Sequence, residues 1–215
     1  MPSKFREDTI STARLTSFSD GVFAIAVTLL VFNLKVPEIA KADVHTLLPG
    51  LIKAMLPHFI TYILTFWLIA AYWIFHHRML NLVIRIDSTF LWINISYLLM
   101  ISFMPFPTAL FASYPRETFS FVFYVCSMIV VGILSLVMSG YASYNHRLIN
   151  KDMPIETIKF FFFRQLTQIG VFILSLPLAF FELRWAEYYL FIVFPINRVA
   201  RGYFRGREEK RKSLW

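Results

Sequence analysis

The sequence predicts an all-α integral membrane protein, with six transmembrane helices in a single domain of residues 1–215. Of the 215 residues, 58% are hydrophobic and 16% are charged, whereas a soluble domain has about 25% charged residues and keeps a polar shell. Six stretches reach or approach the length of about 20 apolar residues that crosses a bilayer. The composition therefore excludes a soluble domain. It also excludes a disordered chain, because disorder needs low hydrophobicity and high charge.

The expected spans follow one another with brief loops, and no linker is long enough to separate a second domain. They are residues 15–34, 54–75, 88–115, 118–145, 165–181 and 185–197. The first contains one charge, Asp20, and the next four contain none. The sixth is the shortest and carries Glu187 at its outer end. A cleaved signal peptide is not expected, because an ordinary signal sequence has no aspartate in its apolar stretch.

The basic residues alternate between the two sides of the membrane as six spans require. With both termini in the cytoplasm, 16 of the 21 Lys and Arg residues fall on the inside and 5 on the outside, which is the bias that membrane proteins have. The tail, residues 198–215, is the most basic segment, and such a tail fixes orientation and touches anionic lipid. No nucleic acid partner is expected, because no nucleic-acid-binding module accompanies this tail.

The first expected helix has an apolar stripe along one face. At helical spacing, Phe18, Val22, Ile25, Leu29 and Phe32 line up. Small or weakly polar residues lie beside the stripe, and small residues let neighbouring helices approach closely. These residues are Gly21, Ala24 and Thr28. The alternative interpretation of this pattern is an ordinary packed helix whose stripe faces neighbouring helices or lipid.

Asp20 lies within this helix, roughly 9 Å from its cytoplasmic end at 1.5 Å per residue. An ionisable residue in a span costs several kcal/mol unless it is paired. The second helix runs the other way, so Trp73 and His76 come to a similar depth, as does Asn94 in the third helix. Indole, imidazole and amide groups can all donate to a carboxylate. We therefore expect a buried polar network that joins these three helices, with Arg14 adding its charge from the interface.

Ser19, Asp20 and His76 are also the residue types of a catalytic triad. Ser19 and Asp20 are consecutive, so on a helix they project about 100° apart. The aspartate is then poorly placed to orient a histidine that serves that serine. His76 and His77 are consecutive too, and they lack the i, i+4 spacing of a shared metal site. We expect no enzyme, no catalytic residue, no fixed metal and no cofactor.

Three motifs occur in order in the first three expected helices. They are Arg14-x-x-x-Phe18-Ser19-Asp20-Gly21-Val-Phe-Ala-Ile-Ala-x-Thr28-Leu-Leu, Trp73-x-x-His76-x-Arg78 and Ile101-Ser-Phe-Met-Pro-Phe-Pro107. Together they resemble the prokaryotic members of the transmembrane protein 175 family, which are potassium-permeable channels. The rest of the chain resembles the family by helix count. The resemblance implies a six-helix subunit in the bacterial cell membrane and a homotetramer in which the first helix lines a potassium pore.

The resemblance also assigns roles to single residues. Ile25, seven residues after the motif phenylalanine, would form the constriction, and Leu29 and Phe32 would continue it, next to Thr28. A leucine is the expected family residue at position 32, so Phe32 departs from the pattern in the outer constriction. The residues that match the family's interhelical polar network are Arg14, Ser19, Asp20, Trp73 and His76.

Two absences bear on the expected mechanism. The sequence has no Thr-Val-Gly-Tyr-Gly filter and no helix with regularly spaced arginines, so neither a carbonyl filter nor strong voltage sensing is expected. We expect passive potassium conduction through an apolar constriction. A proton-coupled secondary transporter that uses Asp20 is the alternative, although transporters place polar groups near the midplane and show internal repeats. A structural membrane subunit without transport is the third possibility.

Overall fold

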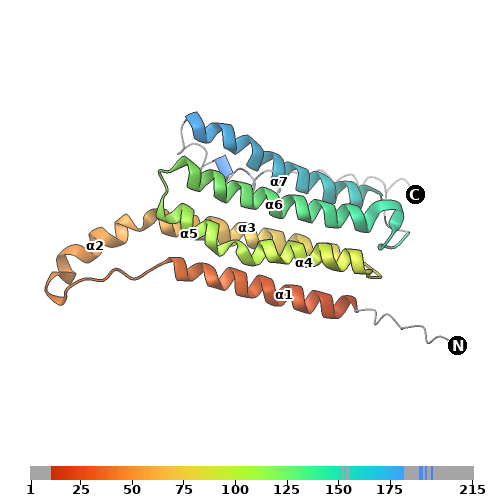
Figure 1. Cartoon of the computed structure of the whole chain (residues 1–215), viewed down its shortest axis with the longest axis horizontal. Coiled ribbons are helices and arrows are strands. Elements are labelled where there is room, and N and C mark those ends of the chain that lie inside the picture. The colour runs from red at the N-terminus through yellow and green to blue at the C-terminus, as the bar shows by residue number, and fades with distance from the viewer. Residues whose placement is uncertain are drawn as a thin grey trace, which may run out of the picture.

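The computed structural model is an α-helical bundle with one short helix projecting from it (Figure 1). The structure describes residues 11–151, 153, 155–181, 189–190, 192 and 195. The helices are α1 (Thr12–Leu29), α2 (Val44–Ala54), α3 (Leu56–Leu80), α4 (Ser88–Phe103), α5 (Pro105–Ser113), α6 (Thr118–Ser143) and α7 (Ile155–Phe181), with 3-10 turns at Leu30–Asn33, Lys41–Asp43 and Tyr144–His146.

Five segments of the described chain are long and apolar enough to cross a membrane, in agreement with a multi-pass membrane protein. They are Thr12–Asn33, Leu56–Leu80, Ser88–Ser113, Thr118–His146 and Ile155–Phe181. They correspond in order to the first five expected spans. The sixth expected span, residues 185–197, falls mostly outside the described residues, and the basic tail, residues 198–215, falls wholly outside them.

Two boundaries differ from the sequence prediction. The third span is two helices with a break at Met104, because Pro105 cannot donate a backbone hydrogen bond and instead begins α5. The last described helix begins at Ile155, ten residues before the expected start at residue 165. Its first turns contain charged residues that the sequence analysis assigned to a loop, and two of these, Glu156 and Lys159, form an ion pair of 3.4 Å on the helix.

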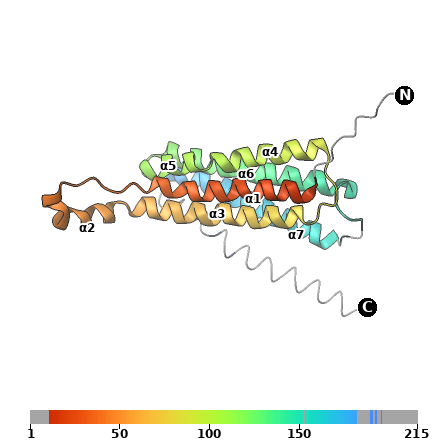
Figure 2. The same ribbon diagram turned by 90° about the horizontal axis from the view of Figure 1, so that it is seen from below.

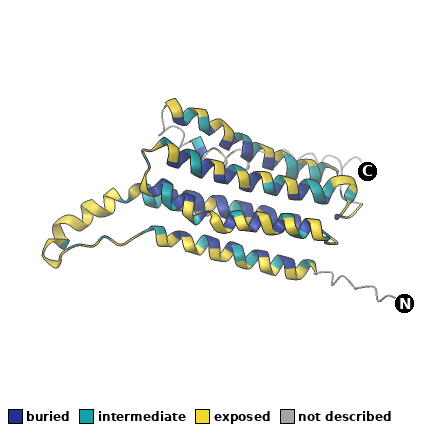
Figure 3. Cartoon of the chain, in the orientation of Figure 1, coloured by how far each residue is buried: buried dark blue, intermediate teal, exposed yellow. Residues whose placement is uncertain are grey.

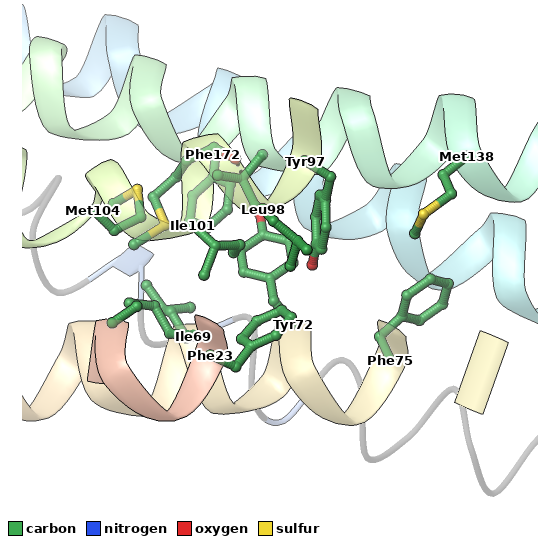
Figure 4. Packing of buried hydrophobic residues seen from close by; sticks show 14 of the residues in the cluster. Phe23, Ile69, Tyr72, Phe75, Tyr97, Leu98, Ile101, Met104, Met138 and Phe172 are labelled. Carbon is green, nitrogen blue, oxygen red and sulfur yellow. Dashed lines mark hydrogen bonds between the residues drawn. The ribbon is translucent and has the colours of Figure 1, made fainter. Parts of the chain in front are cut away.

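The helices form three layers, in which α1 lies on one side, α3, α4 and α5 lie in the middle, and α6 and α7 lie on the other side (Figures 1 and 2). Phe23, Tyr72, Tyr97 and Phe172, from α1, α3, α4 and α7, belong to one buried cluster in the middle of the bundle (Figure 4). Two buried hydrogen bonds tie α3 to α6 inside this core. The Tyr72 hydroxyl donates to the Met128 carbonyl at 3.0 Å, and Thr65 and Tyr124 share a hydroxyl contact of 3.0 Å.

The loops after α3 and α6 lie at the same end of the bundle, which we call the Asp87 end. The backbone N–H of Ile84 donates to the Leu148 carbonyl at 2.9 Å, and Nε of Arg85 donates to the Arg147 carbonyl at 2.8 Å. Asn145 has a φ of 49°, in the left-handed region that lets the chain reverse after α6. These contacts hold the two loops together.

Asp87 links the same two loops to the start of α4. One carboxylate oxygen caps α4 by accepting the Phe90 N–H at 2.8 Å. The other accepts the Tyr141 hydroxyl at 2.8 Å and Nε of Arg147 at 3.3 Å. Partial burial raises the pKa of Asp87. The hydrogen bonds from Phe90 and Tyr141 and the charge of Arg147 more than offset that effect, so the pKa of Asp87 lies below its ordinary value.

The Asp87 contacts predict a stability difference that depends on pH. An aspartate whose pKa is lowered by folding stabilises the protein above its unfolded pKa of about 3.9, and this stabilisation is lost as the pH falls through the lowered folded value. Asp87→Asn keeps a capping oxygen and removes the charge, so it should melt at a lower temperature than wild type at pH 7. The difference should shrink below about pH 4. Asp87→Ala also loses the cap and should lose about 1 kcal/mol more.

Thermal unfolding of the detergent-purified protein, followed from pH 7 to pH 3, measures both effects. A difference between wild type and Asp87→Asn that stays constant over this range would show that the carboxylate charge does not stabilise this end of the bundle.

Candidate functional site

Helix α1 has one covered face and one uncovered face. The covered face carries Leu15, Ser19, Phe23 and Ala26, all buried against α3 and α4, and continues to Leu30 in the following 3-10 turn. The helix begins where Ser11 accepts the Arg14 N–H at 3.4 Å. The described part of the chain therefore covers only one side of this helix, as the exposed residues along the outward side of α1 show in Figure 3.

The uncovered face carries most of the apolar stripe expected from the sequence. The side chains of Ile25 and Phe32 are 61% and 74% exposed, and Phe18 and Leu29 are also exposed. Val22 differs from the expectation, because it is half-buried and packs against the core. The small or weakly polar residues Gly21, Ala24 and Thr28 are exposed on the same side of α1. We call the exposed residues Phe18, Gly21, Ala24, Ile25, Thr28, Leu29 and Phe32 the open face.

Thr28 is the one hydroxyl residue of the open face. Its hydroxyl lies 2.9 Å from both the Ala24 and the Ile25 carbonyl oxygens of its own helix, to which it can donate. The hydroxyl proton of Thr28 is therefore donated within α1. The hydroxyl oxygen keeps acceptor capacity, so Thr28 can offer one oxygen ligand to water or to a cation on the open face.

Asp20 lies at the edge of the open face and is only partly buried. Its Oδ1 accepts the indole N–H of Trp73 at 2.8 Å, which ties α1 to α3. The pair borders a groove of about 390 Å³ between the two helices, whose remaining lining is apolar. The residues that line the groove are Asp20, Phe23, Ala24, Val27, Ala70 and Trp73.

A second polar group joins α1, α3 and α4 inside the bundle. Nε2 of His76 lies 2.7 Å from Oδ1 of Asn94, and Nδ2 of Asn94 donates to the Ser19 hydroxyl at 3.3 Å. All three residues are completely buried. Because the Asn94 oxygen can only accept, His76 carries its proton on Nε2 in this arrangement. The imidazole also stacks on the ring of Tyr97 at 5.2 Å.

The expected single network is therefore two separate groups. Asp20 bonds Trp73 at the surface of the subunit, and His76 bonds Asn94 in the interior. The sequence predicted that His76 would approach the carboxylate as well. The difference arises because Ser19 and Asp20 project in different directions from α1. Arg14 is exposed, and within the described part of the chain its side chain forms no ion pair with Asp20.

Sequence reasoning missed two residues that surround His76. Tyr97 stacks on it, and the ring of Phe23 lies 5.5 Å from it. The signal for Tyr97 was present, because it follows Asn94 by three residues and so shares its helix face. Among the described residues, no group of three or more His, Cys, Asp or Glu side chains could hold a metal ion.

The site lies in the part of the chain that is similar to known proteins. Residues 14–105 match the family described as the endosomal/lysosomal potassium channel TMEM175. A potassium channel of Chamaesiphon minutus is 42% identical over 103 residues, which cover 48% of this chain and 50% of that protein. A potassium channel of Streptomyces collinus is 36% identical over 131 residues, which cover 61% of this chain and 59% of that protein. The chain thus spans about half the length of the curated relatives it matches.

The similarity extends to the three-dimensional fold. The crystal structure of a lysosomal potassium-selective channel TMEM175 homolog from Chamaesiphon minutus aligns with a TM-score of 0.73 and 28% identity, over 91% of this chain and 97% of that chain. The relatives named here are channels, in agreement with the expectation that the chain is not an enzyme. The chain is therefore similar to the TMEM175 family in the sequence of residues 14–105 and to a TMEM175 homolog in its fold.

Proposed function

We propose that the chain is the subunit of a potassium-permeable cation channel, in which four copies surround a pore lined by the open face of α1. The observation that carries the proposal is that the open face is uncovered in the single chain and lies within residues 14–105, the part that matches the channel family. The names of the bacterial relatives, which are potassium channels, support the choice of ion.

Physical chemistry supports assembly through α1 rather than contact with lipid. Placing a carboxylate such as Asp20 in hydrocarbon costs free energy. Asp20 is only partly buried, and among the described residues its hydrogen bond comes from Trp73. Water in a pore entrance or a neighbouring subunit would lower that cost. The exposed Gly21 and Ala24 allow another helix to approach closely. Within the bilayer, a carboxylate beside small residues fits contact with another subunit better than contact with lipid acyl chains.

The narrowest part of the pore is proposed at Ile25 and Leu29, with Phe32 beyond them. These positions are four and three residues apart. Leu29 ends the α-helix and Phe32 lies in a 3-10 turn, so both gaps between the rings of side chains would be about 6 Å along the axis. Apolar rings offer no oxygen ligand and can gate by dewetting. Any preference for potassium then comes from its cheaper partial dehydration, with Thr28 as the nearest oxygen ligand.

The proposed orientation puts the Asp87 end in the cytoplasm of a bacterial cell, with the basic tail on the same side. The support is the excess of Lys and Arg in the segments at that end. The tail, residues 198–215, is proposed to touch anionic lipid.

One observation favours the second candidate, a proton-coupled transporter. Asp20 borders a groove and has one carboxylate oxygen with no hydrogen bond among the described residues. Liposome flux separates the candidates. A channel passes potassium down its gradient without a coupled ion, a transporter needs exchange, and a structural subunit passes nothing.

The first prediction concerns the constriction. Ile25→Asn would place four amides where an ion otherwise loses water without compensation. Current should rise, tenfold for roughly every 1.4 kcal/mol by which the amides lower the free-energy barrier to ion passage. Discrimination between potassium and sodium should weaken. Ile25→Leu keeps the ring apolar and serves as the control with a small current. Single-channel currents and reversal potentials in planar bilayers measure both quantities. Unchanged values for Ile25→Asn would mean that the open face does not line the pore.

The second prediction concerns assembly. In a Cys126→Ala background, Ile25→Cys should crosslink between subunits on oxidation, because the four copies of this position would meet near one axis. Ala26→Cys is the matched control, since Ala26 is the next residue but is buried inside its own subunit. Denaturing gels with and without reductant give the readout. Equal crosslinking at both positions, or a protein that is entirely monomeric in native mass measurements, would contradict the tetramer.

The third prediction concerns the bond between α1 and α3. Asp20→Ala and Trp73→Phe should each lower the melting temperature and the tetrameric fraction. The double variant should lose less than the sum of the two, because both single changes remove the same bond. A coupling of about 1–2 kcal/mol is expected for a hydrogen bond to a charged group at a partly exposed site. Asp20→Asn keeps an acceptor for the indole and should have a smaller effect. Strict additivity in thermal unfolding would show that the bond contributes nothing to stability.

A further inference from the structure

A pocket of about 440 Å³ lies at the end of the bundle opposite Asp87, which we call the outer pocket. Its walls come from the 3-10 turn after α1, the linker that follows, the junction of α2 and α3, and α5. Figure 1 shows these segments at one end of the bundle. None of the residues already assigned to the polar groups of α1 lines it. Its size is within the range of about 300–1,000 Å³ that is usual for sites that bind small molecules.

The lining divides into a basic polar edge and an apolar wall. Lys35 is the one charged side chain among the lining residues, and the polar ones are Asn33, His58 and Ser113. No aspartate or glutamate lines the outer pocket. The apolar wall consists of Phe32, Val36, Leu51 and Met55, together with smaller residues. A ligand that complements both parts has an anionic head and an apolar body.

His58 has an unused hydrogen-bonding group beside the pocket. Its Nδ1 is buried and has no hydrogen-bond partner. Nε2 is the other polar atom of the ring, and it can donate when it carries the proton. Lys35 and His58 come from different elements, the linker after α1 and the first turn of α3, and they line the same pocket.

The position of the outer pocket along the spans also points to an amphiphile. The segment Thr12–Asn33 ends here and Leu56–Leu80 begins here, so the pocket lies where the hydrocarbon core gives way to the headgroup region. A lysine at this depth places its stem on apolar surface and its ammonium among the headgroups. Phosphate and carboxylate are the anions available at this level of a membrane.

We propose that the outer pocket binds the anionic head of a membrane amphiphile, with Lys35 and the His58 imidazole on the phosphate or carboxylate and the apolar body along Leu51 and Met55. A phospholipid and a free fatty acid share this chemistry. Because binding involves no ion flux, the inference does not depend on the proposed channel function. A failure of one is distinguishable from a failure of the other.

The test uses delipidated full-length protein in detergent and native mass spectrometry, with three probes. These are phosphatidylglycerol, phosphatidylcholine of the same acyl chains, and oleate. Phosphatidylglycerol or oleate, or both, should bind wild type at least tenfold more tightly than phosphatidylcholine, and whichever binds identifies the source of the head. Lys35→Gln should weaken that binding at least tenfold. Lys53→Gln should leave it unchanged, because Lys53 is an exposed lysine of α2 that does not line the pocket.

Two further variants keep the test decisive. Lys35→Arg retains the charge and should retain binding, which separates loss of the anion contact from misfolding. His58→Gln should weaken binding less than Lys35→Gln, because an amide donor remains. The proposal is overturned if Lys35→Gln and Lys53→Gln bind the anionic probes equally well. It is also overturned if phosphatidylcholine binds as tightly as both anionic probes. The same holds if a second copy of the chain covers the pocket and no probe binds the assembled protein.

Discussion

The feature on which the rest of the structure depends is that the described residues cover only one face of α1. The covered face places Leu15, Phe23 and Ala26 against α3 and α4, and the other face presents large apolar side chains such as Ile25 and Phe32 to the outside. In a bilayer an apolar surface needs no cover from water, so exposure alone would not argue for a partner. The carboxylate of Asp20 at the edge of this face provides that argument, because lipid cannot solvate it.

The two ends of the bundle differ in the contacts that they contain. At the Asp87 end, the loops after α3 and α6 are joined by backbone hydrogen bonds and by the carboxylate that also caps α4. The same end carries the buried His76, Asn94 and Ser19 contacts that tie α1 to its neighbours. The opposite end contains the outer pocket and the projecting α2, none of whose residues is buried.

The sequence predicted the broad architecture because long uncharged stretches have few alternatives in a membrane, and the first five spans were found in the expected order. It predicted the details less well wherever neighbours decide the outcome. Val22 has the right spacing for the open face, yet packing against the core covers it. His76 has the right depth to meet Asp20, yet the fully buried Asn94 offers a closer acceptor. The amphipathic α2 was not foreseen, because its eleven residues are too few to cross a membrane and Pro49 and Gly50 are typical of a loop.

The direction of Asp20 on α1 favours a channel over a transporter. It lies five positions before Ile25, a rotation of about 140° at 100° per residue, whereas Phe18 lies within about 20° of Ile25. If the open face lines the pore, the carboxylate points sideways toward α3, where the Trp73 indole receives it, rather than at the permeating ion. A transporter needs its titrating group at the binding site, near the midplane. A carboxylate that is turned away from the centre of the open face and bonded to the next helix instead fixes the rotation of α1, and through it the side chains that the open face presents.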